Sequence, residues 1–269
     1  MDEVIISKDK VGAGGECEIY KATFNGQKCI AKMGGGTIRL YQEADILPLF
    51  DSTKIIDLVR GYDDDDCAIL IEYCQGGSLG RYVERKAQSG ENIPWREVVG
   101  AIKQVLEGLA VVHARNVVHC DISPGNVLLR DNSLNDVVIS DFSAAEDLSD
   151  KAQSPYTTCS GTDGFASRRM RNNETRYDEL QPADMHSDFY SVGCLLYFML
   201  TKEYPPSSEV IDFVNGALPE DLLNTWKKSF QEKGGLTEAQ SVSAIGFIKL
   251  TVRDDMTVPA EKVFNYKFE

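Results

Sequence analysis

Three polar residues, Asp121, Asn126 and Asp141, have the types and the spacing that phosphoryl transfer from Mg-ATP requires. Residues 119–126 read His-Cys-Asp-Ile-Ser-Pro-Gly-Asn, and residues 137–142 read Val-Val-Ile-Ser-Asp-Phe. An aspartate can orient an attacking hydroxyl, while an amide and a carboxylate offer the oxygen ligands that Mg²⁺ prefers. On its own this set fits transfer either to a protein or to a small molecule.

Two segments near the N-terminus could bind the phosphates of a nucleotide. Residues 11–19 read Val-Gly-Ala-Gly-Gly-Glu-Cys-Glu-Ile, and a glycine turn lets backbone amides approach phosphate oxygens. Lys32 ends the run Cys-Ile-Ala-Lys, where a cation held by a carboxylate can neutralise phosphates. Each signal is weak by itself, since a glycine hairpin without a ligand and a surface lysine are common.

The elements that must position these residues change character along the chain. Residues 4–73 show short alternating runs, which predict a mostly antiparallel sheet with one inserted helix. Asn25 and Gly26 predict a tight hairpin turn between residues 18–24 and 27–32. The helix is expected over residues 37–47, ahead of Pro48.

Beyond Gly76 and Gly77 the hydrophobic period becomes helical. Apolar residues at three- and four-residue steps predict a long amphipathic helix: Val98, Ile102, Val105, Leu109 and Val112. Residues 188–201 are apolar almost all round and predict a buried helix, and residues 238–250 show a weaker helical face. The pattern predicts an α+β fold with a small sheet lobe over residues 1–75 and a larger, mainly helical lobe over residues 76–269.

The composition favours some partners over others. A net charge of −14 over 269 residues repels nucleic acids and anionic membranes, so neither is expected as a partner and a basic protein fits better. The longest apolar run, residues 189–200, is too short to span a bilayer, so no membrane insertion is expected. Seven cysteines without a Cys-x-x-Cys spacing, and no signal-like start, predict a cytoplasmic protein with reduced thiols.

The ordered series of motifs resembles the protein kinase family, whose catalytic loop reads His-Arg-Asp-Leu-x-x-x-Asn and whose metal loop reads Asp-Phe-Gly. The resemblance implies a two-lobed kinase-like fold, ATP and Mg²⁺ as cofactors, and a protein hydroxyl, of serine or threonine, as acceptor. It assigns catalytic roles to Asp121, Lys32 and Asn126, and metal binding to Asn126 and Asp141.

The resemblance also implies a nucleotide site. Gly12 and Gly14 match the glycine-rich loop, and Glu43 is the expected partner of Lys32, with Asp45 a poorer candidate. Residues 70–79 resemble the hinge between the lobes. The remaining residues expected at the nucleotide are Val11, Ile19, Ala31, Ile71, Glu72, Cys74, Ser78 and Leu128.

Roles within this site differ from residue to residue. The backbone groups of Glu72 and Cys74 would pair with the adenine edge, and Ile71 would control the back pocket. Ser78 is equally suited to reach the ribose or to cap a helix. His119 is expected to be structural, packed beneath the metal loop.

Downstream segments extend the resemblance. Residues 161–165, Gly-Thr-Asp-Gly-Phe, resemble the substrate-docking loop, and Asp188 resembles the start of the buried helix that anchors the catalytic loop.

Several positions depart from the family pattern, and one of them concerns regulation. Cys120 replaces an arginine that in many members pairs with a phosphate on the activation segment, so we expect activity without that phosphorylation. Cys17 replaces the third glycine, Ser123 a lysine usual in serine/threonine kinases, and Ser143 the glycine of Asp-Phe-Gly.

A further departure removes two partners together. Residues 167–169, Ser-Arg-Arg, stand in place of Ala-Pro-Glu, and Val258 stands in place of the arginine that pairs with that glutamate. Because both members of this ion pair are absent, no buried charge is left without a partner, which favours a divergent but functional enzyme. Cys17, Cys74, Cys120 and Cys159 fall near the cleft or the activation segment, and inert thiols are favoured over a redox switch.

Two alternatives remain beside an active protein kinase. One is a nucleotide-binding pseudokinase scaffold, which the retention of Lys32, Asp121, Asn126 and Asp141 disfavours. The other is a small-molecule phosphotransferase of the aminoglycoside or choline kinase type, whose catalytic loop is similar. The hinge, the docking loop and the Asp188 helix speak against it. The oligomeric state stays open.

Overall fold

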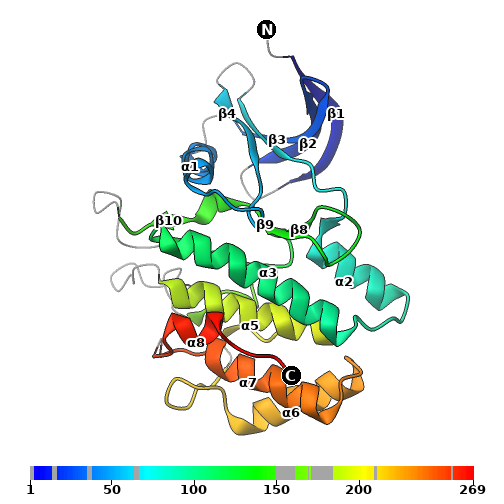
Figure 1. Cartoon of the computed structure of the whole chain (residues 1–269), viewed down its shortest axis with the longest axis vertical. Coiled ribbons are helices and arrows are strands. Elements are labelled where there is room, and N and C mark those ends of the chain that lie inside the picture. The colour runs from blue at the N-terminus through cyan, green and yellow to red at the C-terminus, as the bar shows by residue number, and fades with distance from the viewer. Residues whose placement is uncertain are drawn as a thin grey trace.

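The computed structural model has a sheet lobe that contains the N-terminus and a helical lobe that contains the C-terminus (Figure 1). It describes residues 3–13, 17–34, 38–63, 67–149, 161–168, 170, 184–208, 211–255 and 257–269. The predicted α+β class is confirmed, with an antiparallel sheet and one helix in the first lobe and mainly helices in the second.

The first lobe is built on five antiparallel strands in the order β1-β2-β3-β5-β4. These strands are β1 (Val4–Ala13), β2 (Glu18–Phe24), β3 (Gln27–Met33), β4 (Leu58–Asp63) and β5 (Ala68–Glu72). The predicted hairpin joins β2 to β3, because Asn25 and Gly26 adopt φ angles of 51° and 80° that a type I′ turn requires. This turn fixes the register that places Lys32 opposite Ile19.

Helix α1 (Ile38–Ile46) is the single helix of the sheet lobe, and the structure describes it from Ile38 onward. It passes into a short 3-10 turn, Leu47–Leu49, at the proline that the sequence marks as its end. Proline has no backbone N–H, so the helical hydrogen-bond ladder cannot continue through it. The buried face of α1 contains Glu43, which therefore points inward.

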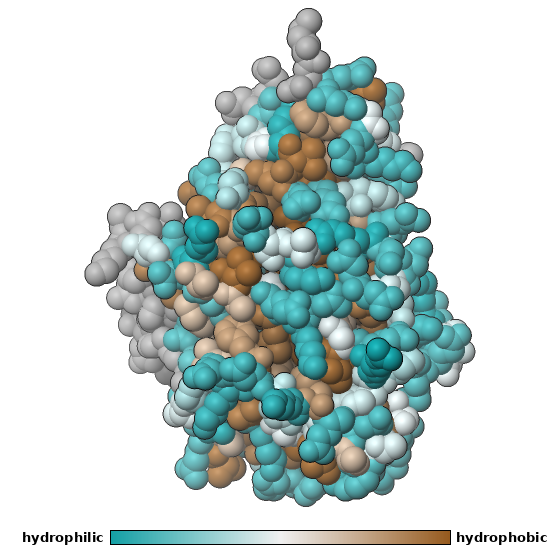
Figure 2. Space-filling view, in the orientation of Figure 1, coloured by the Kyte–Doolittle hydropathy of each residue, from teal (hydrophilic) through white to brown (hydrophobic). Residues whose placement is uncertain are grey.

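The second lobe consists mainly of six helices within the described residues: α2 (Leu79–Gln88), α3 (Trp95–Ala114), α5 (Met185–Thr201), α6 (Glu220–Glu232), α7 (Glu238–Thr251) and α8 (Ala260–Phe264). The predicted apolar stripe of α3 is buried, and α5 is buried nearly all round. Hydrophilic residues cover most of the face seen in Figure 2, with hydrophobic residues between them. No described helix is both long and apolar enough to cross a membrane.

Helix α5 begins three residues before the predicted start. Asp184 caps it, because its side chain accepts a hydrogen bond from the backbone N–H of His186 at 2.8 Å. Helix α7 begins with a reciprocal capping box between Thr237 and Gln240.

Short strands at the lobe boundary hold the residues of the catalytic motifs. Strands β6 (Gly77–Ser78), β8 (Val127–Leu129) and β9 (Val137–Ile139) form one small sheet, and β7 (Val117–Val118) pairs with β10 (Glu146–Asp147). Asn126 directly precedes β8, and Asp141 lies two residues beyond β9. Because β8 and β9 are antiparallel neighbours, these two residues come close together.

Candidate active site

Lys32 is the centre of a buried ionic cluster. Its side chain is 4% exposed, and its Nζ contacts a carboxylate oxygen of Glu43 and, at 2.7 Å, Oδ1 of Asp141. The expected pairing with Glu43 is therefore present, and Asp45 is exposed on the other face of α1. At this lysine, β3 meets the neighbouring helix α1 and Asp141, which lies 109 positions further along the chain.

The charges of this cluster support one another. Burial would lower the pKa of the Lys32 ammonium, but the attraction of Glu43 and Asp141 outweighs it and raises that pKa. Burial would likewise raise the pKa of the Asp141 carboxyl, and the nearby Lys32 holds it below its ordinary value. Both groups are therefore ionised at neutral pH, as phosphate and metal binding would require.

The backbone at Asp141 adopts an uncommon conformation. Its φ angle of 67° lies in the left-handed region, which costs a residue with a side chain about 1–2 kcal/mol. The next residue, Phe142, donates its N–H to Oε1 of Glu43 at 3.2 Å. Glu43 thus holds both Lys32 and the segment that contains Asp141.

Asp121 is oriented by three hydrogen bonds. Its Oδ1 accepts from the backbone N–H of Thr162 at 2.8 Å and from the Thr162 hydroxyl at 2.9 Å. Its Oδ2 accepts from the side-chain amide of Asn126 at 2.7 Å. The predicted docking loop therefore contacts the predicted catalytic aspartate, a contact that the sequence did not indicate.

The amide of Asn126 has a defined orientation. Its Nδ2 donates to the backbone oxygen of Asp121 at 2.9 Å and to Asp121 Oδ2, which leaves Oδ1 as the atom available to a cation. Together with the Asp141 carboxylate this gives two oxygen donors on the same cavity. That set fits Mg²⁺, which binds one or two protein ligands together with substrate phosphates. Within the described residues no group of three or more His, Cys, Asp or Glu forms an all-protein metal site.

Asp188 on α5 holds the catalytic loop from below. This fully buried carboxylate accepts hydrogen bonds from the backbone N–H groups of His119 and Cys120, both at 2.9 Å, and lies 2.8 Å from Nε2 of His113. The predicted anchoring of the loop by this helix thus consists of specific hydrogen bonds.

His119 has the structural position that we predicted. It is fully buried, its Nε2 lies 3.1 Å from the carbonyl oxygen of Ser140, and its ring packs edge-on against Phe142 with centroids 4.7 Å apart. It links the catalytic loop to the metal loop without facing the cavity.

An open cavity of about 490 Å³ lies between the lobes. Eleven of the predicted site residues line it: Val11, Gly12, Ile19, Lys32, Ile71, Glu72, Cys74, Ser78, Asn126, Leu128 and Asp141. Glu43 lies behind Lys32, Ala31 packs in a buried cluster of the sheet, and Asp121 lies beyond Asn126, so these three are not among its lining residues. Gly14 lies outside the described residues.

Other lining residues escaped the sequence reasoning. Arg81 and Arg85, one turn apart on α2, and Asn132 also face the cavity. Ser78 caps α2, because its hydroxyl accepts the Arg81 N–H at 3.3 Å. The helix-cap interpretation of Ser78 is thus correct, and the side chain also borders the cavity. The sequence feature that could have indicated Arg81 and Arg85 is their spacing of four residues, shortly after the capping residue Ser78.

The cysteines at the site are poor nucleophiles. Burial raises the pKa of the Cys74 thiol to about 12 and that of Cys120 well above its ordinary value. Cys29, Cys74, Cys120 and Cys194 are free thiols. These features agree with inert thiols rather than a redox switch, and Cys159 lies outside the described residues.

New contacts occupy the region where the expected acid–arginine pair is missing. Arg168 donates to the carbonyl oxygen of Ile211, lies 3.5 Å from an oxygen of Asp254 and stacks over the Phe213 ring at 5.2 Å. Val258 is tied to α5 through its carbonyl oxygen, 2.7 Å from Nε2 of His186. The fold has thus replaced the pair rather than simply lost it.

His186 gives this replacement a pH dependence. Its two ring nitrogens face acceptors, Asp184 Oδ1 at 2.6 Å and the Val258 carbonyl, and only the imidazolium can donate to both. The hydrogen bond to Asp184 raises the His186 pKa above 6.5. The stabilisation from these two hydrogen bonds is complete at pH values below the pKa that His186 has in the unfolded chain. It is lost as the pH rises through the higher pKa that His186 has in the folded protein.

We therefore expect wild-type stability to fall by about 1 kcal/mol as the pH rises from about 6 to 9, and we expect His186→Gln to remove this part of the dependence. Urea denaturation at a series of pH values measures it. Equal pH slopes for wild type and variant would contradict the assignment.

The fold and the site together are typical of the ATP-dependent phosphotransferases, which combine a buried lysine held by carboxylates, an aspartate–asparagine loop and a cavity between two lobes. The protein kinase domain model matches residues 6–258. The chain belongs to the protein kinase domain family, whose members generally use ATP and Mg²⁺ to phosphorylate proteins.

Several similar curated proteins are named as serine/threonine-protein kinases. The chain is 28% identical over 207 residues to a probable serine/threonine-protein kinase zyg-1 of Caenorhabditis briggsae, covering 74% of this chain and 27% of the relative. It is 28% identical to PLK4 of Nematostella vectensis, covering 76% and 21%, and 26% identical to human Nek11, covering 93% and 38%. The chain thus spans less than two fifths of the length of these relatives.

Proposed function

We propose that the chain transfers the γ-phosphate of Mg-ATP to a serine or threonine hydroxyl of a protein. The observation that carries the proposal is that two contacting pairs, Lys32 with Asp141 and Asn126 with Asp121, meet at one cavity, which Lys32, Asp141 and Asn126 line. The naming of the curated relatives as serine/threonine kinases supports the acceptor type.

The residues divide the work of the reaction. Lys32 supplies a fixed cation for the nucleotide phosphates, with Glu43 holding it in place. Asn126 and Asp141 would hold Mg²⁺, which when bound neutralises charge on the phosphate oxygens. The backbones of Glu72 and Cys74 would bind the adenine edge, and Ile71 would border the back pocket.

Asp121 acts on the acceptor. Its carboxylate is oriented by Thr162 and Asn126, so one residue of the docking loop and one metal ligand fix the direction from which a hydroxyl can approach. It orients that hydroxyl and accepts its proton as the phosphorus–oxygen bond forms.

The two alternatives differ from this proposal in what they require of the site. A scaffold has no need for an oriented Asp121 or for the Asn126 amide and the Asp141 carboxylate on one cavity, so these features support the proposal. A small-molecule phosphotransferase has no need for a docking loop in contact with the catalytic aspartate, whereas Thr162 makes two such contacts.

The deciding experiment incubates the purified chain with radiolabelled Mg-ATP and, in parallel, with protein acceptors or with aminoglycosides and choline. Phosphate transfer to serine or threonine of a protein supports the proposal. Tight ATP binding without transfer would favour the scaffold, and turnover only with the small acceptors would favour the third function.

The charge of the acceptor is a separate part of this test. The net charge of −14 favours basic proteins, whereas Arg81 and Arg85 give the mouth of the cavity a local positive charge. A panel that pairs a basic with an acidic acceptor of the same length distinguishes the long-range effect of the net charge from the local effect of the two arginines.

We also predict little dependence on phosphorylation of the activation segment. Cys120 is 4% exposed, and its thiol donates to the Val118 carbonyl oxygen at 3.6 Å, so this position offers no cation to a phosphate. The candidate phosphoacceptors, Ser154, Thr157, Thr158 and Ser160, lie outside the described residues.

Alanine replacement of these four residues together should leave the transfer rate within about threefold of wild type, as expected where no ordering contact is lost. Rates on a fixed acceptor, with circular dichroism as the folding control, measure the effect. Complete loss of activity in a folded quadruple variant would contradict this prediction.

A further inference from the structure

We propose that Arg130 is a positioning residue for the nucleotide-binding hinge: it holds Glu72 in place from the opposite lobe and so sets the affinity for the adenosine part of the nucleotide. This inference rests on the proposed function, in which the backbones of Glu72 and Cys74 bind adenine. Arg130 itself is not among the residues that line the cavity.

The contact with the hinge is bidentate. Arg130 follows β8, and its Nε donates to Glu72 Oε1 at 2.7 Å while one terminal nitrogen donates to Oε2 at 3.0 Å. The two side chains are 21% and 22% exposed. Paired, charge-assisted bonds of this kind fix geometry more strongly than a single exposed ion pair does.

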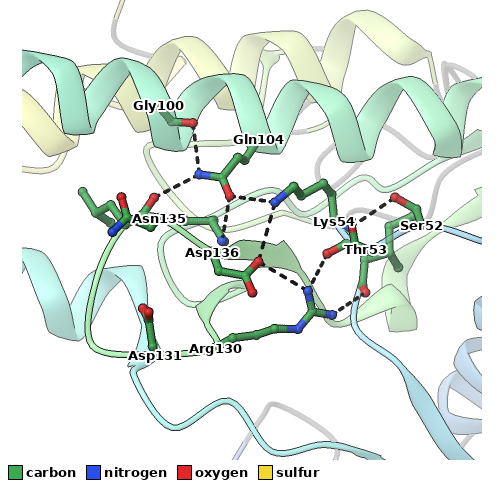
Figure 3. Close-up of polar contacts among 12 residues, drawn as sticks. Ser52, Thr53, Lys54, Gly100, Gln104, Arg130, Asp131, Asn135 and Asp136 are labelled. Atoms are coloured by element: carbon green, nitrogen blue, oxygen red, sulfur yellow. Dashed lines mark hydrogen bonds and ion pairs between the residues drawn. The ribbon is translucent and has the colours of Figure 1, made fainter.

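The same guanidinium also holds the segment before β4. Its terminal nitrogens donate to the carbonyl oxygens of Thr53 and Ile55, and one lies 3.5 Å from Asp136 Oδ1 (Figure 3). One side chain therefore joins the end of β5, the loop that enters β4 and the loop that enters β9.

Gln104 on α3 supports the segments that contact Arg130. Its side-chain oxygen accepts from Lys54 Nζ at 2.9 Å and from the Val137 N–H at 3.1 Å, and its nitrogen donates to the Leu134 carbonyl at 2.9 Å (Figure 3). Lys54 lies 3.6 Å from Asp136. The network is thus anchored on a long buried helix rather than on loops.

The backbone of the hinge is fixed beside the same strand end. Gln75 donates its N–H to the Arg130 carbonyl at 3.2 Å, and Gly76 donates to the Leu129 carbonyl at 3.0 Å. Glu72 is therefore held through its side chain and through its backbone N–H, which donates to the Asp57 carbonyl oxygen at 2.9 Å. Residues 75 and 76 are held through their backbone, and the short segment that contains Cys74 lies between these two points.

This arrangement distinguishes a positioning role from a merely stabilising ion pair. Loss of the two hydrogen bonds from the Arg130 guanidinium should free the Glu72 side chain at one end of the hinge. The cluster of Lys32, Glu43 and Asp141 should stay as it is. Adenosine binding should therefore weaken, and phosphate binding should not.

The test measures binding of two probes, adenosine and Mg-tripolyphosphate, by isothermal titration calorimetry to the full chain. Arg130→Gln should weaken adenosine binding about tenfold, the size expected for lost charge-assisted hydrogen bonds. Tripolyphosphate binding should stay within about twofold. In the transfer assay the KM for ATP should rise while kcat at saturating ATP changes little.

Matched variants separate the possible causes. Arg130→Lys keeps the charge but cannot make the two parallel hydrogen bonds of the guanidinium, so it should give a smaller loss of adenosine affinity than Arg130→Gln does. Glu72→Ala should give a similar loss, and the double variant should be no worse than either single one, since both remove the same contact. Lys249→Gln, which breaks an exposed pair with Glu220 far from the cavity, should change neither probe.

Several results would overturn the proposal. A folded Arg130→Gln protein with wild-type adenosine affinity would do so, as would equal losses for both probes, which would indicate general destabilisation. If Arg130→Gln does not fold, Glu72→Ala and Asp136→Asn decide the question by the same measurements. A wild-type chain that binds neither probe would instead refute the proposed function itself.

Discussion

Replacing Asp121 with asparagine is expected to lower the rate of phosphate transfer to a protein by about 100-fold or more. The carboxylate accepts three hydrogen bonds, from the Thr162 N–H, the Thr162 hydroxyl and the Asn126 amide. An asparagine keeps the shape but cannot accept a proton, and its NH₂ group would meet a donor on at least one side. The transfer rate at saturating ATP and acceptor measures the loss.

Binding of ATP provides the control for this variant. Asp121 contacts Asn126 but not the cluster of Lys32, Glu43 and Asp141, so the affinity for the nucleotide should fall far less than the transfer rate. Thr162→Val removes one of the three donors and keeps the backbone N–H, and it should therefore cost only about tenfold, as one lost hydrogen bond to a charged group would. An Asp121→Asn enzyme with near-normal transfer would rule out the role assigned to this residue.

Local patterns were sufficient to predict most of the fold. The two-residue turn at Asn25 and Gly26, the stripe of α3 and the apolar run of α5 each report a local preference, and the structure contains all three. The start of α5 was placed three residues late because the capping residue, Asp184, lies outside the apolar run that signalled the helix.

The pairing of Lys32 with Glu43 was predictable only through order along the chain. Neither residue differs in type from a surface charge, and their burial depends on α1 turning the face that contains Glu43 toward β3. Composition and periodicity do not contain that information, whereas the series of motifs does.

Contacts between distant segments were the part that the sequence could not predict. Arg130 and Glu72 are 58 residues apart, and His186 and Val258 are 72 apart. No local periodicity links them, because each depends on how whole elements pack. The same holds for Thr162, whose contact with Asp121 spans 41 residues.

The tolerance of Cys120 in the catalytic loop has a physical explanation in these distant contacts. The residue has a φ angle of 66°, a conformation that costs about 1–2 kcal/mol for a residue with a side chain. Asp188 accepts the Cys120 N–H at 2.9 Å and so holds this conformation through the backbone. This backbone hydrogen bond does not depend on the type of side chain at position 120, which is itself buried against Val118, Ala166 and Met170.

Replacing Asp188 with alanine should consequently damage both stability and catalysis. The variant leaves two buried backbone N–H groups and the ring nitrogen of His113 without an acceptor. Loss of one member of a buried charged network costs about 3–5 kcal/mol. We expect the free energy of unfolding to fall by that amount, measured by urea denaturation, and the transfer rate to fall at temperatures where the variant is still folded.

Two further variants separate the role of Asp188 from general helix stability. Asp188→Asn keeps an acceptor for one N–H group and should lose less than the alanine variant. Asp184→Ala removes both the cap of the same helix and the partner of the His186 ring, so it should cost about 2 kcal/mol and leave the transfer rate unchanged. If Asp184→Ala and Asp188→Ala reduce the rate equally, the effect belongs to α5 as a whole. If only Asp188→Ala reduces it, the positive φ at Cys120 depends on this one carboxylate, and the orientation of Asp121, the next residue, depends on it as well.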